Sequence, residues 1–423
     1  MNIEEMNRLQ LNYFLVGETK DVDFRKARLR DLMRAVEENE EKLYKALEDD
    51  LNKSRDEAFF TEISIVKDEI RYALRHVKGW SRDQRVRGSL AVFPSRSYIH
   101  YEPLGVALII APWNYPVNLL LCPLVAAIAA GCCAMLKPSP YTPNVSRVLT
   151  EMIKKTYPAQ YINIVEGHRD INEELLKQRW DLIFFTGSPA LGKIVMAAAA
   201  NNLTPCVLEL GGKSPCIVDK KADLKMAARR IAWGKLLNNG QTCIAPDYLL
   251  VHTKVADKFM SLLDDAIEDL SEKNQIVKIV NDKAMARLES YEDNPEKQWE
   301  EEIFGPILPM RTFSNLEDAE LYVKNHEKPL ALYYFGDEED AERVIRHTSS
   351  GGVVVNDTII HIANPNLPFG GVGNSGMGRY HRKAGFLSFS NPKSVLVAWN
   401  NPLWSRLKEV PFRKSKLLRW LLG

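Results

Sequence analysis

The stretch Val106-Ala107-Leu108-Ile109-Ile110-Ala111-Pro112-Trp113-Asn114 decides the fold class of this chain. Its first five residues are apolar and predict a buried strand, which the proline-bearing turn ends. An almost wholly apolar run at 117–136 follows. Because Pro123 and Gly131 interrupt that run, it predicts a buried helix and then a buried strand rather than a membrane span. A strand, a helix and a second strand in this order predict a parallel sheet.

The same alternation continues outward from this unit. Apolar or β-branched runs predict further strands, and segments of helical period lie between them. The expected strands are at 97–102, 133–136, 161–165, 182–185, 206–210, 215–218 and 248–251, and residues 1–80 are expected to be helical. The fold class is therefore α/β, with a doubly wound parallel sheet.

Composition narrows the possible classes of function. The chain has 423 residues, a net charge of +1 and 45% hydrophobic residues, as expected of a globular protein with two or three domains. A net charge so close to zero gives no field that attracts nucleic acid, so we expect no nucleic-acid partner. The six cysteines show no disulfide framework and no metal-ligand spacing, so we expect reduced thiols and no metal site. Residues 1–8 carry no apolar signal segment, and we expect a cytoplasmic protein.

Cys243 is the first candidate for chemistry. It lies in the polar, glycine-bearing run 239–246, just after a helical and mostly apolar segment at 227–237. Glu209 precedes it in the chain and lies at the end of an expected strand. A thiol nucleophile, together with a carboxylate that activates water, suggests covalent catalysis through a thioester. The alternative is that Cys243 is one more small buried residue.

The turn at 185–192 is the candidate for cofactor binding. No G-x-G-x-x-G fingerprint opens a helix after any of the expected strands. Instead, Gly187 permits a tight turn, Ser188 is a capping residue, and the helix N-terminus offers free N–H groups to a pyrophosphate. An ordinary capped helix is the alternative. Lys137, at the end of another strand, is placed to reach a ribose or a phosphate.

Seven motifs, in one order along the chain, resemble those of the aldehyde dehydrogenase superfamily. They are Pro112-Trp113-Asn114-Tyr115-Pro116, Leu136-Lys137-Pro138-Ser139, Phe185-Thr186-Gly187-Ser188, Leu208-Glu209-Leu210-Gly211-Gly212-Lys213, Gly240-Gln241-Thr242-Cys243, Glu301-Glu302-Ile303-Phe304-Gly305 and Pro368-Phe369-Gly370-Gly371. The runs 245–248 and 376–381 look like the class 3 branch, which includes the fatty-aldehyde enzymes. The resemblance covers about residues 25–395.

The resemblance implies a fold and an assembly. The fold is that of the aldehyde dehydrogenases, with a Rossmann-like cofactor domain, an α/β catalytic domain and a small β bridging element. By analogy, residues 1–80 and 103–211 form the NAD(P)-binding domain and residues 212–388 the catalytic domain. Residues 81–102 and 389–423 then supply the oligomerisation strands and an amphipathic tail, and a homodimer is expected.

The resemblance also implies roles for single residues in the NAD(P)-dependent oxidation of medium- or long-chain aliphatic, or aromatic, aldehydes to carboxylic acids. Cys243 attacks the aldehyde and forms a thiohemiacetal. Asn114 and the main-chain N–H of Cys243 hold the oxyanion, and Glu209 activates the water that hydrolyses the thioester. The implied contacts to NAD or NADP come from Trp113, Lys137, Gly187, Ser188, Gly192, Glu302 and Phe304, and Tyr115 lines the substrate entrance.

Two features depart from the family pattern. Pro140 stands where the family commonly has a glutamate, which holds the adenosine ribose and repels a 2′-phosphate, so we expect this chain to use both NAD and NADP. Between 282 and 302 a strand-turn-strand unit is missing. Its loss predicts an open sheet edge, and it puts the placement of Glu302 and Phe304, and with it cofactor affinity, in question.

The end of the chain and two other functions complete the expectations. Residues 404–423 are basic and amphipathic, which suits contact with an anionic membrane surface, a neighbouring subunit or the substrate tunnel. A CoA-acylating dehydrogenase is one alternative function, although that route does not need Glu209. A catalytically inert binding or assembly protein, left by the deletion, is the other. The joint presence of Cys243, Glu209 and Asn114 argues against it.

Overall fold

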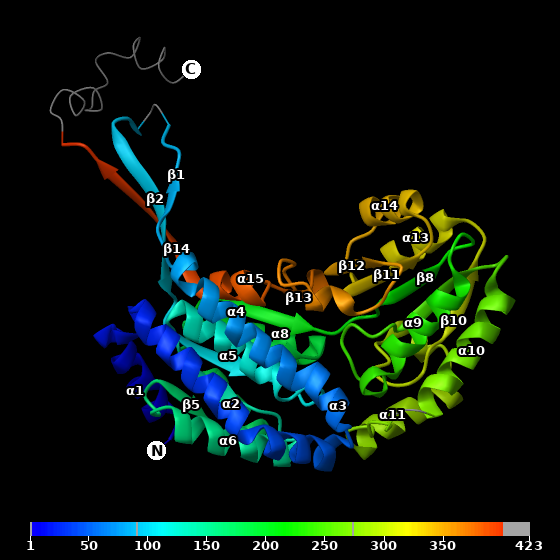
Figure 1. Cartoon of the computed structure of the whole chain (residues 1–423), viewed down its shortest axis with the longest axis horizontal. Helices are drawn as coiled ribbons and strands as arrows, with labels where there is room; N and C mark the ends of the chain where they lie inside the picture. Colours follow the sequence, from blue (N-terminus) through cyan, green and yellow to red (C-terminus); the bar gives the residue numbers. More distant parts are fainter. Residues whose placement is uncertain (1, 90–91, 273–274, 401–423) are drawn as a thin grey trace, which may run out of the picture.

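The computed structural model describes residues 2–89, 92–272 and 275–400. Two α/β bodies lie side by side, each built around its own sheet, and a narrow three-stranded arm projects from one of them (Figure 1). The α/β class and the parallel sheets expected from the sequence are confirmed.

The first body contains a six-stranded sheet in the order β13-β7-β6-β3-β4-β5. All neighbouring strands are parallel except β13 and β7. The strands are β3 (Val106–Ile110), β4 (Cys133–Lys137), β5 (Ile162–Ile164), β6 (Leu182–Gly187), β7 (Cys206–Leu210) and β13 (Gly376–Met377). Chain order runs outward from β3 in both directions. The topological switch point, where doubly wound sheets bind ligands, therefore lies between β3 and β6.

Helices pack on this sheet and on one another. They are α1 (Ile3–Val16), α2 (Val22–Leu51), α3 (Arg55–Ala58), the π-helical turn η2 (Phe59–Ile63), α4 (Ser64–Trp80), α5 (Asn118–Ala130), α6 (Pro143–Thr156), α7 (Arg169–Lys177), α8 (Pro189–Ala200) and α15 (Arg382–Ser388). Every residue of α5 is buried, because the helix lies between the sheet and the helices outside it. Over the described ranges, none of the helices has the length and apolar character needed to cross a membrane.

The second body contains a five-stranded sheet in the order β10-β9-β8-β11-β12, in which all neighbours are parallel. Its strands are β8 (Pro215–Val218), β9 (Tyr248–His252), β10 (Met310–Phe313), β11 (Ala331–Phe335) and β12 (Gly352–Val355). Its helices are α9 (Leu224–Leu236), α10 (Ala256–Glu272), α11 (Asp282–Asp293), α12 (Lys297–Glu300), α13 (Leu316–Lys324) and α14 (Glu338–His347).

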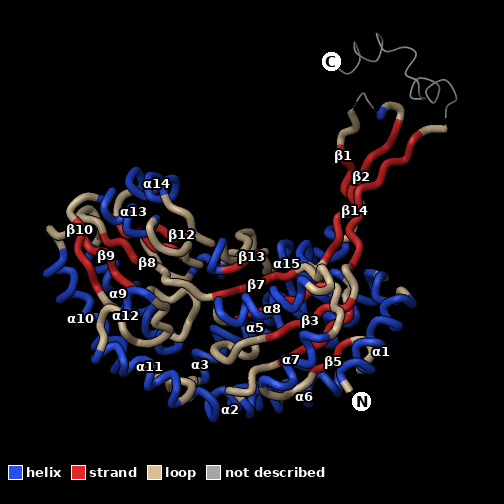
Figure 2. The backbone as a smooth tube through the Cα atoms, turned by 180° about the vertical axis from the view of Figure 1, so that it is seen from behind, coloured by secondary structure: helices blue, strands red, loops and turns tan. Residues whose placement is uncertain are grey.

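The chain passes between the two bodies at β7. Residues 211–214 lead directly from β7 of the first sheet to β8 of the second. The chain returns from the second body as β13, which pairs antiparallel with β7 and sets Gly376 opposite Glu209. Glu209 therefore lies where the two bodies meet, and Figure 2 shows β7 and β13 in this central position.

The arm consists of β1 (Gln84–Val86), β2 (Ser95–Pro103) and β14 (Ser390–Ala398), which pair antiparallel in the order β1-β2-β14. Both views show it clear of the two bodies (Figures 1 and 2). Apolar side chains remain exposed on β14, with Leu396 at 50% and Val397 at 42%. The amphipathic tail predicted at 404–423 lies outside the described residues.

Aromatic contacts hold the end of the shortened segment at 282–302 against the second sheet. α12 leads straight into Glu301, and its Trp299 packs edge-on against Tyr248 and Tyr322. The guanidinium of Arg311, on β10, lies 4.1 Å from the Trp299 ring centroid. The four-residue strand β10 forms an edge of the sheet and pairs with β9 alone among the described strands.

Candidate active site

Cys243 lies after a turn shaped by residues with positive φ. α9 ends at Leu236, and the 3-10 turn η4 (Leu237–Gly240) follows. Asn238, Asn239 and Gly240 have φ values of 51°, 54° and 73°. Asparagine and glycine adopt this conformation most readily, so the sequence permits the sharp reversal. The cysteine beyond it is free, and the residue as a whole is only partly buried, unlike Cys122, Cys132, Cys133 and Cys216.

Two buried carboxyl groups influence the thiol. Burial of the sulfur, followed by the charges of Glu302 and Glu209, raises the pKa of Cys243 well above its ordinary value. At neutral pH the residue is therefore a thiol, and attack on a carbonyl begins with the loss of its proton. The same interactions show that both carboxylates lie close enough to Cys243 to act on its charge.

Two residues that follow β3 contact the residues just before Cys243. The amide Nδ2 of Asn114 donates to the main-chain oxygen of Gln241 at 3.0 Å. This nitrogen carries two hydrogens, so one remains available for an oxyanion. The hydroxyl of Tyr115 lies 2.6 Å from Oγ1 of Thr242. Tyr115 is only 8% exposed, and it therefore forms part of the buried wall beside the cysteine turn.

Glu209 is buried without a partner. It is 4% exposed, and neither carboxylate oxygen has a hydrogen-bond partner among the described residues. Burial raises its pKa well above the ordinary value of 4.5, and Arg379 offsets only part of this shift. A Cβ at Gly370 would lie 3.0 Å from Oε1 of Glu209, so the glycine loop leaves room for the carboxylate. A raised pKa makes the ionised carboxylate a stronger base, which suits a group that takes a proton from water.

The loop 302–305 lies against both of these segments. A Cβ at Gly211 would fall 1.9 Å from Oε2 of Glu302, so this carboxylate packs on the glycine backbone that follows β7. Burial, and then the charge of Asp247, raises the pKa of Glu302 to about 8. The ring centroids of Phe304 and Trp113 are 5.6 Å apart, in an edge-on arrangement. Glu302 and Phe304 therefore lie beside other candidate residues of the site.

Three side chains hold the main chain around Glu302. Lys213 forms an ion pair with Asp247, and Arg287 extends from α11. Their bonds are Lys213 Nζ to Gln298 O (2.7 Å) and Glu301 O (2.9 Å), Asp247 Oδ1 from Ile303 N (2.9 Å), and Arg287 to Glu302 O (3.1 Å) and Ile303 O (2.6 Å). We call these three residues the loop anchors. They fix the end of the shortened segment from both the sheet and α11.

The residues expected at the cofactor follow the strands of the six-stranded sheet. Lys137 ends β4, is 1% exposed and, among the described residues, makes one hydrogen bond, to Pro138 O at 2.8 Å. Burial lowers its pKa to about 8, although Glu166 and Asp170 act in the opposite sense. A lysine has three N–H donors, so this buried group retains donors for a ribose or a phosphate.

The start of α8 also fits a dinucleotide. The hydroxyl of Ser188 caps the helix by accepting from Leu191 N at 3.4 Å, and the other N–H groups of a first helical turn have no partner within the helix. A Cβ at Gly187 would lie 2.5 Å from the ring of Phe185, and one at Gly192 would lie 2.8 Å from Leu210. These glycines therefore allow the close helix–strand packing that a pyrophosphate site needs.

The structure brings one group of predicted residues together and leaves a second group at a shared sheet edge. Cys243, Asn114, Tyr115, Glu209, Glu302, Phe304 and Trp113 are linked by the contacts and charge effects above. Lys137, Gly187, Ser188 and Gly192 follow β4 and β6 at the carboxyl edge, and no described contact joins them to the thiol. Sequence reasoning missed the loop anchors, although Lys213 and Asp247 lie within recognised motifs.

Comparison with known proteins gives the wider context. The family model described as "Aldehyde dehydrogenase family" matches residues 18–298 and 292–395. The 4,4'-diaponeurosporen-aldehyde dehydrogenase of Staphylococcus aureus (strain NCTC 8325 / PS 47) is 43% identical over 418 residues, which cover 91% of this chain and 91% of that protein. The dimeric NADP-preferring aldehyde dehydrogenase of Rattus norvegicus is 41% identical over 416 residues, which cover 91% of this chain and 92% of that protein.

A solved structure and the family match add detail. The structure described as the substrate-bound state of Staphylococcus aureus AldH superposes with a TM-score of 0.96, at 40% identity, over 100% of both chains. The family match divides into two pieces that meet at residues 292–298. This division falls where the sequence predicts the missing strand-turn-strand unit.

Proposed function

The chain belongs to the aldehyde dehydrogenase family, and from this premise and the site geometry we propose that Cys243, Asn114 and Glu209 carry its chemistry. It is an NAD(P)-dependent oxidoreductase that converts aldehydes to carboxylic acids. One observation carries the proposal. A free cysteine that is only partly buried, an amide with one unused N–H and a buried carboxylate without a partner lie on segments that adjoin one another.

The first half of the reaction forms a covalent intermediate. Cys243 gives up its proton through water to bulk solvent, and its sulfur attacks the aldehyde carbon to give a thiohemiacetal. The carbonyl oxygen takes the negative charge, which the second N–H of Asn114 and the main-chain N–H of Cys243 receive. Removing one such donor typically costs roughly 3–4 kcal/mol of barrier.

The residues present fit a nicotinamide dinucleotide. Lys137 and the N-terminus of α8 would hold its adenosine and pyrophosphate groups, and Glu302, Phe304 and Trp113 its nicotinamide end. When bound, the dinucleotide would accept the hydride that leaves the thiohemiacetal carbon, and this loss would leave a thioester on Cys243. Because Pro140 carries no carboxylate to repel a 2′-phosphate, we propose that both NAD and NADP serve.

The second half of the reaction releases the acid. Glu209 takes a proton from water, and the resulting hydroxide attacks the thioester carbon that Cys243 carries. The carbon–sulfur bond then breaks, and the carboxylic acid leaves. In a CoA-acylating route Glu209 would have no function, because CoA rather than water takes the acyl group. In an inert protein the arrangement of Cys243, Asn114 and Glu209 would have no function. Neither alternative is favoured.

We also propose a homodimer and a preference for medium- or long-chain aldehydes. The rat relative is named as dimeric, and the arm of this chain exposes Leu396 and Val397 beside an unpaired strand edge among the described residues. The aldehyde preference is supported by the class 3 resemblance. Light scattering after size-exclusion chromatography measures the assembly, and a monomer would contradict the first proposal.

A stopped-flow assay tests the assignment of the nucleophile. Hexanal is mixed with enzyme and either NAD or NADP, and reduced cofactor is followed by absorbance. We expect wild type to turn over with both cofactors and Cys243→Ala to produce no reduced cofactor. Cys206, another free and partly exposed cysteine, gives the matched control, and Cys206→Ala should retain activity. Turnover by Cys243→Ala would overturn the proposal.

A further inference from the structure

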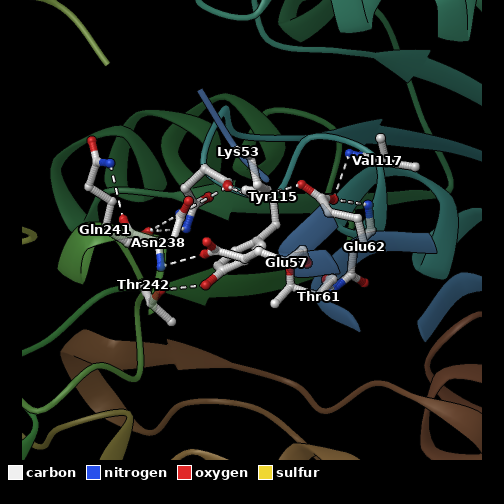
Figure 3. A network of polar contacts seen from close by, with 11 residues as sticks. Lys53, Glu57, Thr61, Glu62, Tyr115, Val117, Asn238, Gln241 and Thr242 are labelled. Carbon is white, nitrogen blue, oxygen red and sulfur yellow. Dashed lines mark hydrogen bonds and ion pairs between the residues drawn. The ribbon is translucent and has the colours of Figure 1, made fainter. Parts of the chain in front are cut away.

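A buried polar network lies behind the cysteine turn and joins segments that are distant in sequence (Figure 3). We infer that Asn238 and the ion pair Lys53–Glu62 are positioning residues, which set the oxyanion donor Asn114 against the Cys243 turn. The inference rests on the proposed function and deepens it. No contact in the described structure joins these three side chains to the thiol, so their effect is exerted through Asn114 and Gln241.

Asn238 bridges the two loops with a single amide group. Its Nδ2 donates to Asn114 O at 3.1 Å and to Gln241 O at 2.9 Å, and Nδ2 of Asn114 donates to the same Gln241 oxygen at 3.0 Å. Two N–H groups and two carbonyls thus fix the distance between the loops. This distance sets the orientation of the side-chain amide of Asn114. It therefore also sets the direction of the second N–H of that amide, which is free for the oxyanion.

The ion pair holds the Asn114 loop from the other side. Lys53 and Glu62 are both fully buried, with Nζ 3.0 Å from Oε1, and Nζ also donates to Asn114 O at 3.2 Å. The other oxygen of Glu62 accepts from Val117 N at 3.1 Å and Asn118 N at 2.8 Å. The pair therefore fixes the main chain before and after Pro116. Figure 3 shows Glu62 between Lys53 and Val117.

Further contacts close the network. Oε1 of Glu57 accepts from Asn238 N at 2.7 Å, which holds the turn residue in its left-handed conformation. Nζ of Lys53 lies 4.3 Å from the ring centroid of Tyr115, whose hydroxyl reaches Thr242. Burying an ion pair contributes little net stability, because desolvation offsets the attraction. The main effect of the Lys53–Glu62 pair is therefore to orient the Asn114 loop.

A matched pair of glycine variants tests the bridge. Asn238 and Asn239 are adjacent, share the left-handed conformation, and each donates a side-chain amide to a main-chain carbonyl, for Asn239 that of Val277 at 2.9 Å. Glycine tolerates this conformation, so both variants keep the backbone. Small misplacements of a catalytic group cost up to about a hundredfold in rate. We expect Asn238→Gly to lower the rate of the first turnover about ten- to a hundredfold and Asn239→Gly to stay near wild type.

Two additional readouts separate positioning from general damage. Alkylation of Cys243 by iodoacetamide reports access to the thiol and needs no oxyanion donor. Hydrolysis of p-nitrophenyl acetate needs the donor but no dinucleotide. We expect Asn238→Gly to lose ester hydrolysis in parallel with the first turnover and to keep its alkylation rate. Equal rates in the two glycine variants, or an alkylation rate that falls with the others, would overturn the inference. A wild type that cleaves the ester but never reduces the dinucleotide would contradict the proposed function alone.

The ion pair is tested by neutralisation in two steps. Lys53→Met leaves Glu62 buried without its cation, and we expect this variant to lose stability. The double variant Lys53→Met/Glu62→Gln keeps a similar shape without charge, and the amide oxygen that replaces the carboxylate still accepts from the main chain. We expect the double variant to recover its melting temperature but not its first-turnover rate, because Asn114 O still lacks the Lys53 donor. Recovery of both quantities together would show that the pair acts on stability only.

Discussion

Asn114 and Glu209 have the same exposure, 4%, and opposite surroundings. The main-chain oxygen of Asn114 accepts two hydrogen bonds, and its side chain donates a third. Glu209 has no hydrogen-bond partner among the described residues. The difference follows from their tasks. A donor that stabilises a transient oxyanion has to be fixed before the charge forms, whereas a base has to keep its lone pairs for the water it deprotonates.

Lys137 resembles Glu209 in this respect. It is buried, yet it makes one hydrogen bond among the described residues and retains further N–H donors. A buried polar group without partners is costly, so its presence at a candidate site calls for an explanation, such as a catalytic role or a bound molecule. We call the Asn114 network the fixed side of the site, because the main-chain oxygen and the side chain of Asn114 both have partners within the protein. We call Glu209 and Lys137 the open positions, and we propose that they receive water and cofactor.

The largest effect should come from removing the base at the open position. We expect Glu209→Gln to complete a first turnover, visible as a burst of reduced cofactor, and then to lose steady-state turnover by about 10²- to 10⁴-fold. The amide preserves the shape of the site but cannot accept a proton from water. Stopped-flow absorbance with hexanal measures both phases. Normal steady-state turnover would mean that the base lies elsewhere.

The unpartnered carboxylate should also cost stability. Burial raises the pKa of Glu209 in the folded state above its ordinary value of 4.5, so the folded chain binds this proton more tightly than the unfolded chain. Stability therefore falls as the pH rises from 4.5 towards the folded pKa, by roughly 1.4 kcal/mol per pH unit. Glu209→Gln removes this slope. The melting temperature of Glu209→Gln minus that of wild type should therefore increase as the pH is raised from 5 to 8.

Thermal unfolding over this pH range provides the check. Wild type and Glu209→Gln share all other titrating groups, including Glu302, so their difference isolates the one carboxylate. A constant difference in melting temperature between pH 5 and pH 8 would show that Glu209 has an ordinary pKa and is not a strained, open position.

The loop anchors test whether Glu302 belongs to the fixed side. Arg287→Gln removes the donors to Glu302 O and Ile303 O, and hydrogen bonds from charged groups contribute about 1.5–3 kcal/mol each. Without these bonds the loop 302–305 is less ordered in the free enzyme, and binding of the cofactor has to order it. We therefore expect the Kd for NADP to rise by roughly tenfold. The first-turnover rate at saturating NADP should change little. Arg229→Gln, at a surface ion pair between α9 and α10, is the matched control.

Fluorescence titration of NADP against the two arginine variants distinguishes these outcomes. An unchanged Kd in Arg287→Gln would show that the shortened segment places Glu302 without this anchor. A fall in the first-turnover rate without a change in Kd would assign Arg287 to the chemistry instead.

The sequence predicted the open positions better than the fixed side. Glu209, Lys137 and Cys243 lie at strand ends or in a glycine-bearing turn, where short motifs identify them, and β7 and β8 have the bounds expected. The fixed side depends on pairs such as Lys53 with Asn114, which are 61 positions apart, and Arg287 with Ile303 from different elements. A charged residue near a helix end normally faces solvent, so nothing local marks Lys53 as buried. The pair Asn238-Asn239 before a glycine was the one available signal.

The smallest effect concerns the open position around Lys137. Pro140 follows Lys137-Pro138-Ser139 and offers no carboxylate to the adenosine ribose, so we expect wild type to use NADP with a kcat/KM no less than about 10⁻³ of that for NAD.

Pro140→Glu restores a carboxylate that accepts from the ribose hydroxyls and repels a 2′-phosphate. We expect it to lower the NADP/NAD ratio of kcat/KM about tenfold, equivalent to roughly 1.4 kcal/mol. Pro140→Gln changes the backbone in the same way without adding charge, and its ratio should stay near that of wild type. Because the effect requires a cofactor that meets this edge of the sheet, equal ratios in the glutamate and glutamine variants would place the adenosine away from Pro140. Lys137 would then be a buried lysine with unused donors and no part in binding.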